Sequence, residues 1–233
     1  MKTPKVSAII PAYNEAGNIG ATITALKGLN WLDEIIVVDD GSKDETGKIA
    51  EEAEVIVFRL AENRGKGMAM EVGAAASRGD VLLFLDGDLR ETAANAWPLA
   101  EPILQGRANM AVALLPLSGK GGFGIVQGLS RWAVARAGGG LLAQPLSGQR
   151  AMAREVWQKF GSFRGGFGVE TALGMGVARL GFSLLEVPVD MSHDRTGKTI
   201  KGLAHRGQQL IHVVLAILRN WRLLLPEKGG VDG

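Results

Sequence analysis

The strongest constraint on the fold is a regular alternation of short apolar runs and helical stretches along the first 90 residues. Four runs have the composition of buried strands: Val6–Ile10, Glu34–Asp39, Val55–Phe58 and Val81–Leu85. Between them, Ile19–Leu26, Lys43–Ala53 and Gly67–Ser77 have helical spacing. Strands and helices that alternate in this way predict parallel strands covered by helices on both faces. The sequence therefore predicts an α/β fold.

The second half of the chain is less regular. Two helices are expected, at Ala93–Leu104 and Val169–Leu180, and three strands, at Met110–Leu115, Ser147–Ala153 and Ser183–Val187. Glycine-rich loops are expected at residues 118–124 and 138–140. The chain has 233 residues, and it has neither an internal repeat nor a linker-like stretch. A chain of this length without a linker is expected to form one domain.

Composition excludes several classes of protein. The chain has no cysteine, which excludes a disulfide scaffold and thiolate metal sites and fits a reducing compartment. Residues Met1–Lys5 lead into the first apolar run without a signal-peptide pattern, and no apolar stretch is long enough to span a bilayer. We therefore expect a cytoplasmic protein. The net charge of +2 gives no general argument for nucleic-acid binding.

Two carboxylates follow the fourth apolar run. Asp86 and Asp88 flank Gly87 directly after the run VLLFL. Ligands of open α/β sheets bind beyond the carboxyl ends of the strands. Carboxylates at i and i+2 of a turn can converge on one hard divalent cation, Mn²⁺ or Mg²⁺, which would bridge the oxygens of a diphosphate. The sequence therefore predicts a metal-dependent diphosphate site here.

Polar residues also follow the other predicted strands. Arg64 and Lys66 lie among glycines at an expected helix start, where they could meet the same phosphates. Asp40 and Glu15 could accept hydrogen bonds from a nucleobase or a ribose. Together these groups predict a nucleotide site along one edge of the sheet.

Four motifs in this order resemble the family 2 glycosyltransferases of the GT-A fold, a Rossmann-like and mostly parallel sheet flanked by helices. They are SAIIPAYNEAGNI, EIIVVDDGSKDET, NRGKGMAMEVGAA and DVLLFLDGDL, and they cover roughly residues 6–90. The resemblance implies a nucleoside-diphosphate sugar as the donor, UDP- or GDP-linked. It implies the following roles in the donor site: Pro11, Ala12, Tyr13 and Glu15 line the nucleotide pocket, Asp40 contacts the base, Lys66 lies near base or phosphate, and Asp86, Gly87 and Asp88 form the metal-binding DxD turn.

Later motifs are similar to two narrower groups, the polyprenyl-phosphate sugar synthases and glucosyl-3-phosphoglycerate synthase. The motifs are PLSGQRAMARE, GGFGVETALGMGVARLGF and EVPVDMSHDRTGK. This resemblance places Gly148 and Glu170 beside the acceptor, with Glu170 joining Asp88 as a candidate catalytic residue. It makes His193 a third metal ligand and Arg195 a phosphate contact. We expect the loop of residues 190–200 to close over the diphosphate.

The resemblance divides the chain into parts. Residues 1–115 are expected to bind the nucleotide-sugar and residues 116–202 to form the acceptor side of a domain spanning 1–202. Residues 203–233 are expected to form an amphipathic helix and tail. From Arg195 to Arg222 there are six basic residues and no acidic one, which suggests an anionic partner. The helix could pack on the domain or on a second copy of the chain, or lie peripherally on the inner face of the membrane.

The expected reaction is transfer of a sugar to a phosphate-bearing acceptor such as a polyprenyl phosphate. A soluble enzyme similar to glucosyl-3-phosphoglycerate synthase is an alternative. A nucleotidyltransferase that makes a nucleotide-sugar is another, although PAYNEAGN lacks the basic glycine-rich loop usual in that class. A family member that binds without catalysis is disfavoured by the DGD triplet. A dehydrogenase is disfavoured because no GxGxxG follows the first strand.

Overall fold

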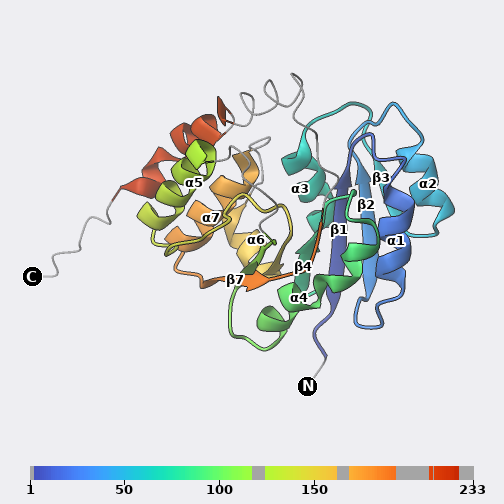
Figure 1. Cartoon of the computed structure of the whole chain (residues 1–233), viewed down its shortest axis with the longest axis horizontal. Coiled ribbons are helices and arrows are strands. Elements are labelled where there is room, and N and C mark those ends of the chain that lie inside the picture. The colour runs from blue at the N-terminus through green and yellow to red at the C-terminus, as the bar shows by residue number, and fades with distance from the viewer. Residues whose placement is uncertain (1–2, 117–123, 162–167, 193–209, 212, 226–233) are drawn as a thin grey trace, which may run out of the picture.

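The computed structural model describes residues 3–116, 124–161, 168–192, 210–211 and 213–225. Its centre is a seven-stranded sheet with the order β3-β2-β1-β4-β6-β5-β7. The strands are β1 (Val6–Ala12), β2 (Glu34–Asp39), β3 (Ile56–Arg59), β4 (Val81–Phe84), β5 (Met110–Leu114), β6 (Arg150–Ala153) and β7 (Leu184–Pro188). Helices flank the sheet, as Figure 1 shows. The predicted α/β fold with one mostly parallel sheet is therefore confirmed.

One strand runs against the others and has consequences for the site. β1 pairs in parallel with β2 and with β4, and β5 pairs in parallel with β7. In contrast, β6 is antiparallel to both of its neighbours, β4 and β5. The register sets Phe84, the last residue of β4, opposite Arg150, the first residue of β6. The segment that enters β6 therefore arrives at the carboxyl end of β4.

Both faces of the sheet are buried. Along β1, Ala8 and Ile10 belong to one apolar cluster and Ile9 to another on the opposite face. This alternation follows from the two-residue period of a strand. The helices are α1 (Ile19–Lys27), α2 (Thr46–Glu52), α3 (Lys66–Ala76), η1 (Arg90–Ala96), α4 (Trp97–Leu104), α5 (Gly124–Arg136), α6 (Arg154–Phe160), α7 (Val169–Arg179) and η3 (Trp221–Leu224).

Several predicted elements differ in detail. The helix expected at Ala93–Leu104 is the 3₁₀ segment η1 followed by α4. β6 begins at Arg150 rather than Ser147. The sequence also favours Asn14 as the N-cap of the helix expected at Ile19–Leu26, and this expectation is wrong, because Asn18 occupies the N-cap position. Asn14 instead has a positive φ of 56° and binds the loop after β2, accepting a hydrogen bond from the amide of Lys43.

The chain's last described segment packs against the second half of the domain. Residues 210–211 and 213–219 are helical and η3 follows them. Val213 and Ile217 share an apolar cluster with Val134 of α5 and Met175 of α7. Among the described residues, no helix is long and apolar enough to cross a bilayer. This segment therefore contributes apolar side chains to the core that supports α7.

At Gly73, α3 packs closely against β1 and β2, and this packing is testable. A β-carbon at Gly73 would overlap Cγ2 of Ile9 and lie 3.3 Å from Cγ2 of Val38. We expect Gly73→Ala to lower the free energy of unfolding by about 1–3 kcal/mol, because α3 must move away from the sheet. Gly128→Ala is the control, since its β-carbon in α5 would meet nothing within 4 Å. Urea denaturation in which both variants match the wild type would contradict this packing.

Candidate functional site

The carboxyl ends of the central parallel strands lie together. Ala12 of β1 stands opposite Asp39 of β2, and the amide of Asp40 donates a hydrogen bond to the carbonyl of Ala12 at 2.8 Å. β4 lies on the other side of β1 and runs directly toward Asp86. The loops that follow β1, β2 and β4 therefore share one edge of the sheet, as the sequence predicts.

A cluster of charged side chains occupies this edge. Nζ of Lys66, the first residue of α3, lies 2.6 Å from Oδ1 of Asp86 and 3.2 Å from Oε1 of Glu170. The side chains are 22%, 25% and 10% exposed, respectively, so the lysine is largely removed from water. Asp86 follows the fourth strand, while Glu170 lies in the first turn of α7. One lysine therefore joins the expected donor and acceptor halves of the chain.

The segment entering β6 completes the cluster. Nε2 of Gln149 donates a hydrogen bond to Oδ2 of Asp86 at 2.8 Å, so both carboxylate oxygens of Asp86 accept hydrogen bonds. A β-carbon at Gly148 would lie 2.5 Å from Oδ2 of Asp86 and 2.6 Å from Nζ of Lys66. Glycine is therefore required here because the backbone passes directly over the ion pair. Sequence reasoning missed Gln149, which belongs to no motif of charged residues.

The loop before Gly148 is held by a second set of hydrogen bonds. The carboxylate of Glu186 in β7 accepts from the amides of Ala143 and Gln144, each at 2.6 Å. The side-chain amide of Gln144 in turn donates to the carbonyl of Leu115 at 2.8 Å. These contacts fix the path of the chain between α5 and β6. They explain how a long loop can deliver Gly148 and Gln149 to fixed positions.

Arg150 lies beneath the cluster and is 1% exposed. Its guanidinium donates to the carbonyls of Ser147 and Glu170, whereas its buried Nε has no hydrogen-bond partner among the described residues. Burial lowers the pKa of Arg150, despite the attraction of Glu170 and Asp86. Sequence reasoning also missed this residue. It places a second buried positive charge beside the two carboxylates and ties the start of β6 to that of α7.

Asp40 has a different immediate role from the expected base contact. Its two carboxylate oxygens accept hydrogen bonds from the backbone amides of Arg64 and Gly65, both at 2.8 Å. The side chain of Asp40 is buried, and Arg64 is exposed. Asp40 thus fixes the loop that precedes Lys66. Contact with a nucleobase remains a prediction.

The residues expected to line the nucleotide pocket follow or end β1. Pro11 and Ala12 are buried in the strand, whereas Tyr13 is 41% exposed beyond it. Glu15 accepts a hydrogen bond from Nδ2 of Asn18, and a β-carbon at Gly87 would lie 3.3 Å from Cγ of Glu15. The loop after β1 therefore lies against the DxD turn. That Pro11, Ala12, Tyr13 and Glu15 bind the nucleotide stays a prediction.

The DxD turn fits a divalent cation. The carbonyl of Gly87 accepts a hydrogen bond from Oγ1 of Thr22 at 2.8 Å, which fixes the turn between the partly buried Asp86 and Asp88. Mg²⁺ and similar cations commonly use one or two carboxylates, with phosphate oxygens and water as the other ligands. Within the described ranges, no group of three metal-ligating side chains occurs. His193 and Arg195 lie outside the described residues.

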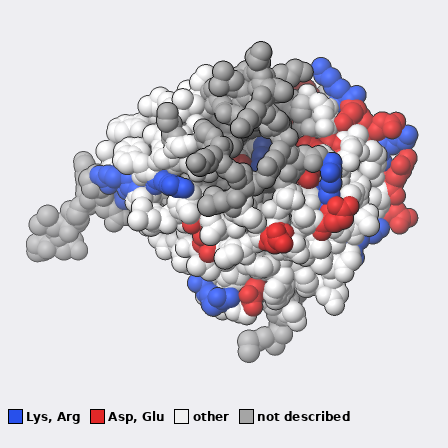
Figure 2. Space-filling model, in the orientation of Figure 1, with Lys and Arg blue, Asp and Glu red and all other residues white. Residues whose placement is uncertain are grey.

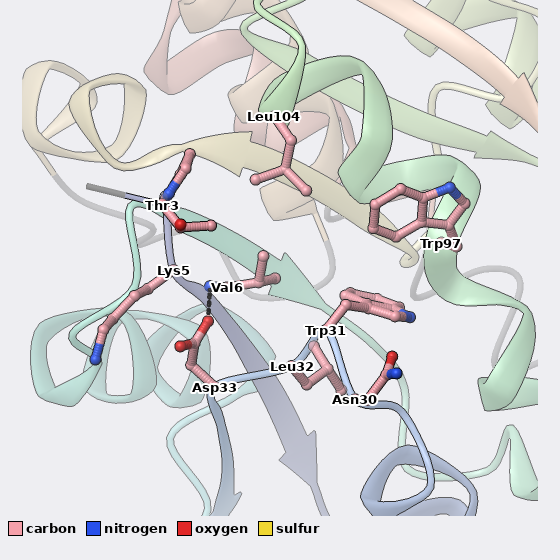
Figure 3. A pocket seen from close by; sticks show the side chains of 10 residues that line it. Thr3, Lys5, Val6, Asn30, Trp31, Leu32, Asp33, Trp97 and Leu104 are labelled. Atoms are coloured by element: carbon pink, nitrogen blue, oxygen red, sulfur yellow. Dashed lines mark hydrogen bonds between the residues drawn. The ribbon is translucent and has the colours of Figure 1, made fainter. Parts of the chain in front are cut away.

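A pocket of about 620 Å³ lies away from this cluster, at the amino end of β1. It is lined by Val6, Trp31, Asp33, Trp97 and other residues, and Figure 3 shows the hydrogen bond that the amide of Val6 donates to Asp33. Trp31 and Trp97 contact each other edge to face, with ring centroids 5.2 Å apart. The charged cluster lies at the carboxyl edge, where α/β sheets bind ligands, and is the better candidate site.

The mostly parallel sheet, with the DxD turn and the partly buried Lys66 at its carboxyl edge, has the arrangement expected of a GT-A fold. Comparison with known families gives the same result. The model of glycosyl transferase family 2 matches residues 7–161. The chain belongs to glycosyl transferase family 2.

Individual relatives point to two acceptor classes. The chain is 32% identical over 192 residues to glucosyl-3-phosphoglycerate synthase of Mycolicibacterium paratuberculosis, covering 72% of this chain and 58% of the relative. It is 32% identical over 126 residues to mouse dolichyl-phosphate beta-glucosyltransferase, covering 46% of this chain and 37% of the relative. The chain thus spans only about a third to three fifths of the length of these curated relatives.

The structural likeness extends over both halves. The glucosyl-3-phosphoglycerate synthase of Mycobacterium tuberculosis has been solved with Mn²⁺, UDP and glucosyl-3-phosphoglycerate. That structure superposes with a TM-score of 0.77 at 27% identity and covers 97% of this chain and 82% of the other. A second structure, of the same enzyme with Mg²⁺ and UDP, gives a TM-score of 0.78. The likeness therefore includes the second half of the chain as well as the first.

The ion pairs of Lys66 give the first prediction for the site. Burial alone lowers the pKa of Lys66, but Asp86 and Glu170 outweigh it, and its pKa lies above the ordinary value. A raised folded-state pKa means that the stabilisation is complete below the unfolded pKa and is lost only as the pH rises through the folded one. We expect Lys66→Met to lower the free energy of unfolding by about 2 kcal/mol, equally at pH 6 and pH 9.

Urea denaturation at the two pH values measures this effect. Lys48→Met is the matched control, because Lys48 is 59% exposed and, among the described residues, pairs with Glu45 on the surface. It should change the free energy of unfolding by less than about 0.5 kcal/mol. A cost for Lys66→Met that disappears at pH 9 would mean that Lys66 is already neutral there, contrary to the raised pKa.

Gly148 gives the second prediction for the site. The new methyl group of Gly148→Ala would displace Asp86 and Lys66, so we expect the affinity for UDP with Mn²⁺ to fall about tenfold or more. Isothermal titration calorimetry measures it. Gly17→Ala is the control, because its β-carbon would meet nothing within 4 Å in the loop after β1. Equal affinities for both variants and the wild type would remove Gly148 from the site.

Proposed function

We propose that the protein transfers a hexosyl group from a UDP- or GDP-linked sugar to a phosphate-bearing acceptor, with a divalent cation as cofactor. The observation that carries the proposal is the buried cluster of Lys66, Asp86 and Glu170. It brings the DxD turn, a lysine that could contact phosphate and a carboxylate of the second half within hydrogen-bonding distance. The solved relatives with UDP and Mn²⁺ support the same assignment.

The donor side would work through charge and position. Asp86 and Asp88 would hold Mn²⁺ or Mg²⁺. The cation would neutralise negative charge on the nucleoside diphosphate as it leaves. Lys66 would add its positive charge at the amino end of α3, beside amides that favour phosphate oxygens. Gln149 keeps Asp86 oriented by occupying Oδ2. Pro11, Ala12 and Tyr13 would form the wall beside the base.

The acceptor side would lie over Gly148 and Glu170. Glu170 is oriented by its contact with Lys66, and would hold the acceptor hydroxyl, or accept its proton where the acceptor is an alcohol. A phosphate acceptor is already ionised and needs no such base. We further propose that His193 adds a metal ligand and Arg195 a phosphate contact from the loop of residues 190–200.

Two acceptor classes remain as specific candidates. A small phosphorylated acid is favoured by the likeness to glucosyl-3-phosphoglycerate synthase, which covers 97% of this chain. A polyprenyl phosphate is favoured by the dolichyl-phosphate relatives and by apolar side chains exposed near the C-terminus. Both acceptors present a phosphate near the reacting oxygen, which suits the positive charges of Lys66 and Arg150.

Nucleoside-diphosphate release tests the proposal. We expect UDP to be released from UDP-glucose when Mn²⁺ and either 3-phosphoglycerate or a short polyprenyl phosphate are added, and the acceptor that gives release identifies the class. Asp88→Asn should reduce release and UDP affinity about 100-fold or more, because it removes a charged metal ligand. Glu45→Gln is the control, since Glu45 is 70% exposed on the surface.

Two results would contradict the proposal. Release that is equal with Mn²⁺ and with excess EDTA would exclude the metal from the reaction. Pyrophosphate release from a nucleoside triphosphate and a sugar phosphate would identify a nucleotidyltransferase instead. Screening GDP-sugars in the same assay settles which nucleotide the donor carries.

A further inference from the structure

The helical residues near the C-terminus are apolar on two sides. Val213 and Ile217 face inward and are 1% and 8% exposed. Ile211, Leu215 and Leu218 lie on the other side of the same helix, at spacings of four and three residues, and are 58%, 39% and 61% exposed. A helix on a protein surface normally presents polar residues outward. The outward stripe is therefore not explained by the fold of the described chain.

Neighbouring elements add large apolar side chains to this end of the molecule. Trp132 of α5 is 53% exposed, Leu141 in the following loop 91%, and Trp221 of η3 51%. α5, the helical residues 210–219 and η3 share one apolar cluster and lie together in Figure 1. We call the exposed set the C-terminal face; it consists of Trp132, Leu141, Ile211, Leu215, Leu218 and Trp221.

The charges around this face have one sign. Within the described residues 124–149 and 210–225, the acidic and basic side chains other than histidine are Arg131, Arg136, Arg219 and Arg222. Each of these arginines is exposed. Figure 2 shows blue side chains at the end of the molecule that carries α5. Among these described residues, the elements of the apolar face thus carry four positive charges and no carboxylate.

Exposed apolar side chains together with arginines favour one kind of binding partner. A symmetric interface between two copies of the chain would set like charges against each other, which is costly. An anionic bilayer accepts both features, because apolar side chains enter the boundary between headgroups and acyl chains while arginines meet the lipid phosphates. Tryptophan is enriched at that depth. We propose that the C-terminal face binds peripherally to an anionic membrane surface.

The location of the face links the membrane to the site. α7 begins beside Glu170 at the charged cluster, and its Met175 and Ala178 pack in the same apolar cluster as α5 and residues 213–217. Membrane binding would therefore hold the acceptor half, rather than the nucleotide half, close to the lipid. The binding itself does not depend on the proposed transfer reaction, so the two can fail separately.

Vesicle flotation with the full-length protein tests this proposal. The wild type should float with vesicles of phosphatidylcholine containing about 30 mol % phosphatidylglycerol, should not float with phosphatidylcholine alone, and should be released by salt. Arg219→Gln with Arg222→Gln should lower the partition constant about tenfold or more, since each cation near an anionic surface adds to the binding. Leu218→Ser with Trp221→Ser should also lower it about tenfold.

A matched control carries Lys48→Gln with Arg107→Gln, which removes two exposed charges elsewhere. This control should float as the wild type does, and all variants should keep UDP affinity with Mn²⁺. Failure of the wild type to float with anionic vesicles would overturn the proposal, as would equal loss in the control and in the arginine variant. A dimer in size-exclusion chromatography with light scattering that Leu218→Ser with Trp221→Ser converts to monomer would show that a second copy covers the face.

Discussion

The buried contact of Lys66 with Asp86 and Glu170 is the interaction on which the candidate site depends. Two carboxylates that lie this close and are largely removed from water repel each other, and the lysine between them offsets that repulsion. Arg150 adds a second positive charge beside the same carboxylates, so Lys66 and Arg150 together match the charges of Asp86 and Glu170. A divalent cation and a diphosphate carry charges of opposite sign. If they enter the site together, neither the added positive charge nor the added negative charge is left without a partner.

The fold brings these residues together through one antiparallel strand. Parallel strands deliver Asp40 and Asp86 to the carboxyl edge, but they cannot deliver the start of another strand there. Because β6 runs against β4, its amino end reaches the same edge with Gly148, Gln149 and Arg150. The strands of the first half are parallel, and the reversal at β6 brings residues of both halves of the chain to one edge of the sheet.

The alternation of strands and helices was sufficient to predict the sheet. The rule that ligands bind at strand ends was sufficient to predict that Asp86 and Lys66 lie at its carboxyl edge. Gly148 and Glu170 were reached only by family resemblance, because their positions depend on contacts between distant segments. Gln149 and Arg150 lie within the motif PLSGQRAMARE, but no role was assigned to them, since a polar residue entering a strand is common. α5 was also missed, because glycines in its first turns obscure the helical pattern. Local sequence predicts elements better than the contacts between them.

The central claim is that nucleotide, metal and the charged cluster meet at the carboxyl edge of the sheet. Crystals grown with UDP and Mn²⁺, measured at a wavelength where manganese scatters anomalously, test it most directly. We expect one strong anomalous peak within bonding distance of Asp88, with the UDP diphosphate beside Lys66. A peak or a nucleotide located instead at the Trp31 and Trp97 pocket, with the Asp86 turn empty, would contradict it.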